Sequence, residues 1–287
     1  MKVSGFTIVA NAVRLDFPVV ESIRSILDCC EEVVVNVGRS DDGTLDLVRS
    51  LRDPRIRVLE TRWDMSRGPA VLAEETARAM GACRHRWGIY IQADEVLHEH
   101  GVPSLLDAIG RADRDPSIEG VVVRYRHIFG RGDLEATNRH WYRREVRAVR
   151  LDPSAMVHPF RDAQGFRVGP SDRRVRALLA DAEMFHYGYL RSAAAMRNRI
   201  AVDRTLYPER GAPEGDPAYL WWAPGLRPFR GSHPAVALEW VAARSLDPER
   251  RISPPRPRLR HLRYYCSDWI ERLTGWRPFE FRNYELR

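Results

Sequence analysis

Lysine is almost absent from this sequence, because Lys2 is the only one among its 46 basic residues. The formal net charge of +7 is therefore carried by arginine. Much of the excess lies near the end, where residues 249–287 hold ten arginines against five acidic residues. A basic surface of this kind suits phosphates on a nucleotide, an anionic membrane face or a nucleic acid. It is equally consistent with a solvated, arginine-rich surface.

Cysteine is also scarce, and long apolar runs are missing. Cys29 and Cys30 are adjacent while Cys83 and Cys266 stand far apart, which gives neither a disulfide framework nor a zinc-type pair. No apolar stretch approaches the roughly 18 to 20 residues of a membrane-spanning helix. The first residues lack the features of a secretory signal. We therefore expect a cytoplasmic protein, and a peripheral contact between its basic end and the inner face of the membrane is compatible with this.

Hydrophobic residues make up 44% of the chain and aromatic residues 9%, a composition typical of folded globular proteins. A chain of 287 residues can bury one substantial core. A proline-rich stretch at residues 253–257 separates the main body from a basic, aromatic tail. We expect one domain followed by an extension.

Strand and helix signals alternate over the first hundred residues, which predicts an α/β sheet with parallel strands. The expected strands lie at residues 6–10, 32–37, 56–59 and 87–91, and the expected helices at 19–27, 44–51 and 69–80. Polar turns follow the second strand, at residues 38–44, and the fourth, at residues 92–95. Ligands of open α/β sheets bind outside the carboxyl ends of the strands, so both turns should lie at one edge.

The pattern is looser after residue 101. Expected elements are a helix at 103–109, a strand at 121–125, a polar loop at 130–138, strands at 147–151 and 182–187, a helix at 192–202, a loop at 213–232, and a helix from 234 to 240. The last of these loops contains Trp221 and Trp222. These two rings would either anchor the loop to the core or stack on a sugar.

The two polar turns carry acidic side chains. Asp94 and Glu95 directly follow a buried strand and offer the hard oxygen ligands that Mg²⁺ or Mn²⁺ prefers. The alternative is a solvated turn or a helix cap. In the earlier turn, Asp41 or Asp42 would accept a hydrogen bond from a nucleoside base or ribose, or Asp42 would only cap the next helix.

The order of these elements, with the motifs VVVNVGRSDDGT and QADEVLHE, resembles the nucleotide-binding half of family 2 glycosyltransferases of the GT-A fold. The resemblance covers about the first hundred residues, and extends more weakly to HYGY at residues 186–189 and GWRPF at 275–279. It implies a GT-A-like (Rossmann-like) mixed α/β sheet flanked by helices, with a helical, basic C-terminal extension. The implied domains are a catalytic domain at residues 1–250 and the extension at 251–287. Within the former, residues 1–100 bind the nucleotide sugar and 101–250 the acceptor.

The same resemblance implies an inverting transfer of a sugar from a nucleoside diphosphate sugar to an acceptor hydroxyl, with Mn²⁺ or Mg²⁺ as cofactor. Asp94 matches the last acidic position of the family's DXD metal motif, whereas Gln92 occupies the first and removes one carboxylate. His186 would be a second metal ligand, as a late histidine is in several enzymes of this fold, or a hydrogen-bonded core residue.

Further candidate residues follow from the strand ends. An inverting displacement needs a general base on the acceptor side, for which Asp162 and Glu145 are the candidates, with Asp133 behind them. The positions expected to hold the donor are Ala10, Asn11, Arg14, Asn36, Gly38, Ser40, Asp41, Asp42, Gln92 and Ala93.

The acceptor is not specified by the sequence. A glycan of a bacterial surface polysaccharide, a lipid-linked sugar or a small molecule is compatible with it, and a nucleic acid is less favoured. A nucleotidyltransferase would usually carry a basic, glycine-rich loop after the first strand, and residues 10–14 are not such a loop. The alternatives are a noncatalytic protein that binds nucleic acid or an anionic surface on a degenerate transferase fold, and a nucleotidyltransferase.

Overall fold

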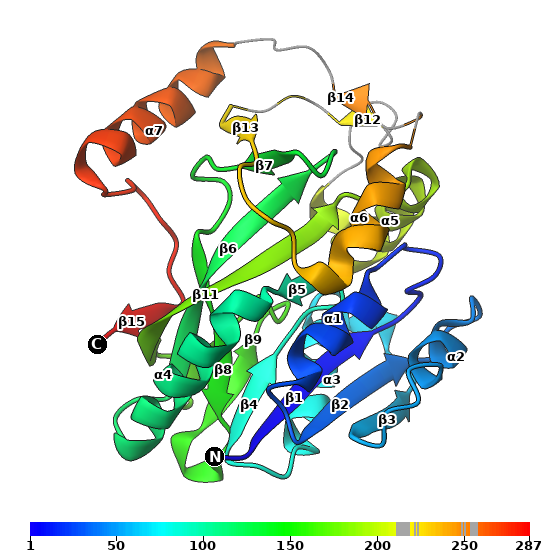
Figure 1. The fold of residues 1–287 in the computed structure, drawn as a ribbon, viewed down its shortest axis with the longest axis vertical. Coiled ribbons are helices and arrows are strands. Elements are labelled where there is room, and N and C mark those ends of the chain that lie inside the picture. The colour runs from blue at the N-terminus through cyan, green and yellow to red at the C-terminus, as the bar shows by residue number, and fades with distance from the viewer. Residues whose placement is uncertain (211–218, 221, 223, 248, 250, 253–257) are drawn as a thin grey trace.

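The computed structural model describes residues 1–287 except 211–218, 221, 223, 248, 250 and 253–257. Trp221 and the proline-rich stretch at 253–257 thus lie outside the described residues. A mixed sheet with the strand order β13-β7-β6-β8-β4-β1-β2-β3 forms the centre. β11 also pairs with β6, and β5 and β15 pair with β11. Figure 1 shows α1 and α4 in front of this sheet and α3 behind it.

The first half of the chain forms the parallel part of the sheet, as predicted. Its strands are β1 (Val3–Val9), β2 (Glu32–Gly38), β3 (Ile56–Thr61) and β4 (Trp87–Tyr90). They pair in the order β4-β1-β2-β3, all parallel, so their carboxyl ends share one edge. All residues of β1, β2 and β4 are buried, which explains why the sequence reads as continuous apolar runs.

Helices cover both faces of these strands. α1 (Val19–Leu27) and α4 (Val102–Arg114) pack on one face, while α3 (Ala70–Gly81) packs on the other. The short α2 (Thr44–Arg49) connects β2 to β3 along the chain. In α1, Val19, Ile23, Ile26 and Leu27 are buried at helical spacing. The predicted helices therefore form through apolar faces turned toward the sheet.

The second half of the chain extends the sheet with strands of both directions. β8 (Arg144–Arg150) runs antiparallel to β4 and to β6 (Gly120–Phe129). β11 (Val175–Tyr189) runs parallel to β6 and antiparallel to the short β5 (Glu95–Leu97). The expected mixed sheet is confirmed, and β6 and β11 are longer than the stretches predicted at 121–125 and 182–187.

Short strands were missed by the sequence analysis. The predicted polar loop at 130–138 contains β7 (Leu134–Ala136), which pairs with β6 and with β13 (Leu226–Pro228). A hairpin of β9 (Val157–Phe160) and β10 (Gly165–Val168) follows β8. Strands of three or four residues carry too few side chains to establish an alternating pattern, so periodicity does not reveal them.

The last part of the chain contains helices and a returning strand. α5 (Ala193–Leu206), α6 (Leu238–Ser245) and α7 (Leu262–Thr274) are helical, and β12 (Tyr219–Leu220) pairs with β14 (Arg251–Ile252). β15 (Tyr284–Leu286) returns to the sheet beside β11 (Figure 1). Among the described residues, no helix is long and apolar enough to cross a membrane.

Candidate active site

A pocket of about 590 Å³ opens at the carboxyl edge of the parallel strands. Six of the residues singled out from the sequence line it: Ala10, Asn11, Gln92, Ala93, Asp94 and Asp162. The first two follow β1, the next three follow β4, and Asp162 lies in the β9–β10 turn. The structure therefore brings three separate predicted segments to one cavity of the size that small-molecule sites have.

The lining of the pocket combines apolar side chains with charged and polar ones. Ile8, Trp63, Met65 and Leu72 supply apolar side chains to its lining. Charged and polar side chains line the rest: Asp94, His140, Asp162, Gln164, Arg191, Arg199, Asp203 and Tyr207. An aromatic ring and aliphatic side chains suit a planar base, and paired arginines suit phosphate oxygens.

The adjacent carboxylates of Asp94 and Glu95 have different surroundings. Asp94 lines the pocket, and its Oδ2 accepts a hydrogen bond of 2.6 Å from Nη2 of Arg191. Glu95 is completely buried, where it accepts two hydrogen bonds from Arg147, of 2.9 and 2.8 Å, and one of 2.6 Å from Tyr125. Glu95 is thus part of the core, and Asp94 alone faces the cavity.

Arg191 is the main polar partner of Asp94 and was not identified from the sequence. Its guanidinium is buried, lies 4.1 Å from the centre of the Phe17 ring, and has an Nε without a hydrogen-bond partner among the described residues. Burial, together with the nearby charge of Arg199, lowers the pKa of Arg191 to about 10. Arg191 remains charged at neutral pH and keeps donor capacity at the pocket.

His186 lies behind Asp94 in a short chain of histidines. Nε2 of His127 lies 2.7 Å from the carbonyl oxygen of Tyr142, which can only accept, so this nitrogen carries the proton of a neutral ring. Nδ1 of His127 then accepts the 3.1 Å hydrogen bond from Nδ1 of His186. The free lone pair of neutral His186 is consequently on Nε2, 3.7 Å from Oδ2 of Asp94.

Burial and charge set the protonation of these groups. Burial lowers the pKa of His186 despite the opposing carboxylates of Asp94 and Glu95, which favours the neutral ring at neutral pH. Burial alone would raise the pKa of Asp94, but the charge of His186 when it is protonated, together with the charges of Arg191 and Arg199, more than offsets it and lowers that pKa. At neutral pH the site holds an ionised carboxylate beside a neutral imidazole.

The turn after β2 braces the site from outside the pocket. Ser40 accepts a hydrogen bond from the backbone of Asn11 at 2.9 Å, and Asp42 accepts one from the backbone of Arg14 at 2.7 Å. The guanidinium of Arg14 pairs with the exposed Asp41 at 2.6 Å. None of Arg14, Ser40, Asp41 and Asp42 lines the pocket. The contacts of Ser40 and Asp42 with the backbone hold the loop that carries Asn11.

Asn36 and Gly38 also lie outside the lining. Asn36 is buried and donates to the backbone carbonyl and the carboxylate of Glu75. Gly38 is packed against the pocket residue Trp63, because a Cβ at position 38 would lie 2.7 Å from the indole ring. Gly38 therefore shapes the pocket indirectly, by leaving room for Trp63.

The two candidates for a general base have different positions. Asp162 lines the pocket and accepts a 3.0 Å hydrogen bond from the hydroxyl of Tyr207. Glu145 is buried in β8, accepts hydrogen bonds from Asn283 and the backbone of Val146, and does not line the pocket. Asp133 is exposed and paired with Arg131. Of the three, the structure brings only Asp162 to the cavity.

The helix α5 supplies pocket residues that sequence reasoning missed. Arg199, Asp203 and Tyr207 line the cavity at intervals of four residues, with Val202 and Leu206 between them. This spacing places them on one helical face and was visible in the sequence.

Comparisons with known proteins gave weak similarities only. No protein-family model matches the chain, and no curated protein matches it. The structure of S. aureus TarS 1–349 in complex with UDP is 19% identical over 46% of this chain and 38% of its own, with a TM-score of 0.38. The complex of the same fragment with UDP-GlcNAc is 19% identical over 46% of this chain and 36% of its own, with a TM-score of 0.37.

The structure of S. aureus TarS without that truncation is 13% identical over 70% of this chain, with a TM-score of 0.46. The chain spans 39% of the length of that protein. At these values, the assignment of a function depends on the residues of this chain.

Proposed function

We propose that this protein is a glycosyltransferase that binds a nucleoside diphosphate sugar in the pocket and transfers the sugar to an acceptor hydroxyl with inversion. The observation that carries the proposal is the meeting of Asn11, Asp94 and Asp162 in one cavity beside the buried Arg191 and the partly exposed Arg199. The sequence resemblance to family 2 glycosyltransferases supports it, because it rests on the same turn after β4.

The donor would lie with its base toward Trp63 and its diphosphate toward Arg191 and Arg199. Apolar side chains of the pocket exclude water from a stacked base. Arg191 presents a buried positive charge where the leaving diphosphate develops negative charge. The backbone of Asn11 is held by Ser40, so the β1 loop has a fixed position against the donor.

The residues present fit a divalent cation of the Mg²⁺ or Mn²⁺ type. Oδ2 of Asp94 and the unprotonated Nε2 of His186 lie 3.7 Å apart, within reach of a single ion. Both would hold it, and the bond between Asp94 and Arg191 would loosen in exchange. A bound cation would act as a Lewis acid that neutralises the leaving diphosphate.

Asp162 would take the proton of the acceptor hydroxyl as its oxygen attacks the anomeric carbon. Its carboxylate lies in the cavity, and the hydroxyl of Tyr207 fixes its orientation with a hydrogen bond. The bond to the diphosphate oxygen breaks as the new glycosidic bond forms, and the proton leaves on Asp162. The acceptor would be a glycan, a lipid-linked sugar or a small molecule.

The direct test is a thermal-shift panel of UDP, GDP, ADP and UDP-GlcNAc, each with and without Mn²⁺. A ligand that binds only the folded protein raises its melting temperature. At a ligand concentration 100 times the dissociation constant, the free energy of unfolding rises by about 2.7 kcal/mol. We expect at least one nucleotide to produce a shift that grows with Mn²⁺. The absence of any shift with all of them would refute the proposed donor site.

A further inference from the structure

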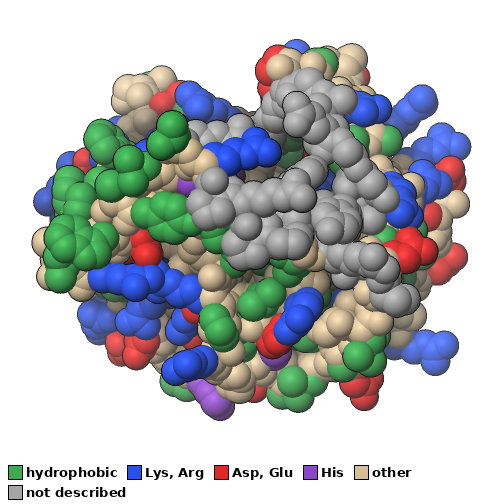
Figure 2. Space-filling view, turned by 90° about the horizontal axis from the view of Figure 1, so that it is seen from above, with side chains coloured by type: hydrophobic (Ala, Val, Ile, Leu, Met, Phe, Trp, Pro, Cys, Tyr) green, Lys and Arg blue, Asp and Glu red, His purple; other side chains and the backbone are tan. Residues whose placement is uncertain are grey.

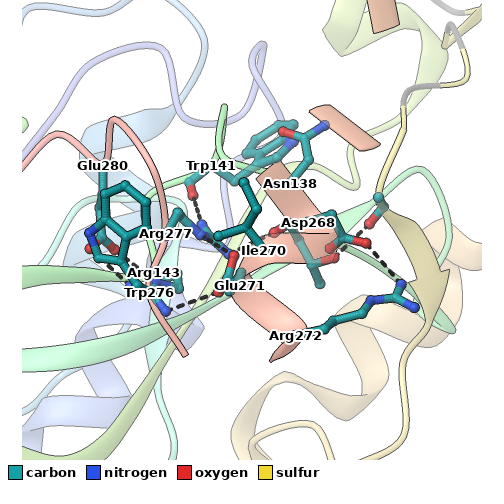
Figure 3. Close-up of polar contacts among 12 residues, drawn as sticks. Asn138, Trp141, Arg143, Asp268, Ile270, Glu271, Arg272, Trp276, Arg277 and Glu280 are labelled. Atoms are coloured by element: carbon teal, nitrogen blue, oxygen red, sulfur yellow. Dashed lines mark hydrogen bonds and ion pairs between the residues drawn. The ribbon is translucent and has the colours of Figure 1, made fainter. Parts of the chain in front are cut away.

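The helix α7 faces the body of the protein with its polar side (Figure 3). Its acidic residues are Asp268 and Glu271. Asp268 pairs with Arg227 of β13, and Glu271 accepts hydrogen bonds from Arg143 at 2.9 Å and Arg277 at 2.6 Å. Both carboxylates are therefore used to hold α7 to the body.

Buried hydrogen bonds fix this orientation from below. Arg277 is buried and also donates to the backbone carbonyls of Trp141 and Thr137, each at 2.8 Å. Arg143 donates in addition to Glu280 with both Nε and Nη2. The contacts come from β13, from the loop before β8 and from the segment after α7, so the helix has one defined rotation about its axis.

The opposite side of α7 is apolar and exposed. Leu262, Tyr265, Trp269 and Leu273 recur three or four residues apart, which places them on one stripe of the helix. Their exposure is 60%, 41%, 65% and 65%. Phe279, just beyond the helix, is 88% exposed. A surface helix normally turns such a stripe inward, so α7 has the reverse of the usual arrangement.

Basic side chains flank this stripe. At 3.6 residues per turn, Arg263 and Arg272 fall on opposite sides of it, and both are exposed. Arg272 also pairs with Asp268 at 2.9 Å. No acidic residue of α7 shares this side, because Asp268 and Glu271 face inward. Figure 2 shows hydrophobic side chains gathered on the α7 side of the molecule, with basic side chains close by.

We propose that α7 is a membrane-surface helix that binds an anionic lipid bilayer. The apolar stripe would enter the boundary between headgroups and acyl chains, with Trp269 at the interface. Arg263 would pair with a lipid phosphate. The positive charge beside the stripe favours this partner over an apolar protein surface, on which Arg263 would have no counterion. The proposal does not depend on the proposed transferase activity.

The test is vesicle flotation of the full chain. Two sets of vesicles would be compared, one of phosphatidylcholine alone and one of equal parts phosphatidylcholine and phosphatidylglycerol. We expect the protein to float with the anionic vesicles and to remain below with the neutral ones. In the double variant Trp269→Gln, Leu273→Gln, partitioning should fall on the order of 100-fold, because two apolar side chains no longer enter the bilayer.

Matched controls separate this face from general surface effects. Leu246→Gln removes another exposed leucine, 81% exposed, that lies after α6 and should not change flotation. Arg263→Gln should weaken binding to anionic vesicles, whereas Arg114→Gln, at the end of α4, should not. Unchanged circular dichroism and melting temperature would establish that each variant is folded.

Three outcomes would overturn the proposal. One is a wild-type protein that fails to float with either set of vesicles. Another is a double variant that floats as well as the wild type. The third is a wild-type dimer, seen by light scattering, that the double variant loses while neither protein binds vesicles. That result would make the stripe a contact between two copies of the chain.

Discussion

At the residue scale, Asp94 is the side chain on which the proposed chemistry depends most. Its Oδ2 contacts Arg191 at 2.6 Å and lies 3.7 Å from Nε2 of His186. Asp94→Asn keeps the shape but removes the charge. We expect turnover of the nucleotide sugar to fall by about 100-fold or more. Without the Asp94 carboxylate the cation is held less firmly, so the negative charge that develops on the leaving diphosphate is not neutralised. The enhancement of nucleotide binding by Mn²⁺ should disappear in a thermal-shift assay.

The matched control is Asp41→Asn, a carboxylate on an adjacent turn that is exposed and paired with Arg14. It should leave turnover and the response to Mn²⁺ unchanged. If Asp94→Asn kept wild-type kinetics and a wild-type response to Mn²⁺, another residue would have to hold the cation, and the proposed site would be wrong.

Gly38 tests whether Trp63 contributes to donor binding. In Gly38→Ala the new Cβ would lie 2.7 Å from the Trp63 ring and 3.0 Å from Cβ of Ala10, so the indole must shift. We expect affinity for UDP, measured by calorimetry, to fall about tenfold, a typical effect of overpacking. The control Gly110→Ala meets nothing within 4 Å and should raise stability by about 0.5–1 kcal/mol with unchanged affinity. Equal affinities of both variants would contradict a role for Trp63.

The sequence predicted pocket residues where the strand order alone determines position. Asn11 and Asp94 follow strands of a parallel sheet, whose carboxyl ends necessarily meet. The sequence does not show that Asp162 lines the pocket while Glu145 is buried away from it. The burial of Glu145 depends on the strands that pair with β8 in the folded sheet. Arg191 approaches Asp94 from 97 positions away, a contact that local sequence patterns do not encode.

At the element scale, predictability followed burial and length. The strands β1, β2 and β4 are buried on both faces and therefore read as apolar runs in the sequence. β7 is a three-residue strand and β15 pairs with β11 from about a hundred residues away. Such strands are specified by their partners rather than by their own composition.

His233 attaches the segment before α6 to Gly132 and Tyr187, and its protonation should change the stability of the fold. Nε2 of His233 donates to the carbonyl of Gly132 at 2.9 Å, so the neutral Nδ1 accepts the 2.9 Å bond from the hydroxyl of Tyr187. Burial lowers the pKa of His233 below its ordinary 6.5. The unfolded chain therefore binds the proton first, so this contribution to stability is complete above pH 6.5 and is lost as the pH falls through the folded-state pKa.

The variant His233→Gln cannot titrate at this position. Above pH 6.5 it should be less stable than the wild type by about 1–2 kcal/mol, because two hydrogen bonds are disturbed. Below that pH the difference should shrink, since the wild type loses the same contacts. Urea unfolding on both sides of pH 6.5 measures the two differences. A difference that stayed constant with pH would show that His233 does not titrate in this way.

At the scale of the whole molecule, one buried ion pair joins the two halves of the sheet. Glu95 begins β5 just after the β4 turn, and Arg147 lies in β8. Both side chains are completely buried, and Tyr125 of β6 donates to the same carboxylate. The carboxylate also accepts a 3.1 Å hydrogen bond from the backbone of Gln92, in the turn that carries Asp94. The parallel half and the mixed half of the sheet thus share one polar centre.

This centre should make the molecule unfold as a unit, and its members should be strongly coupled. Glu95→Gln leaves the buried guanidinium of Arg147 without a counter-charge, so we expect a loss of roughly 3–5 kcal/mol in the free energy of unfolding. Arg147→Met should cost a similar amount, because the carboxylate is then unpaired. In the double variant neither position 95 nor position 147 carries a charge. Its loss in the free energy of unfolding should therefore be well below the sum of the two single losses, which a double-mutant cycle in urea would measure. Additive losses would mean that the two side chains stabilise the halves independently, and that the ion pair does not couple them.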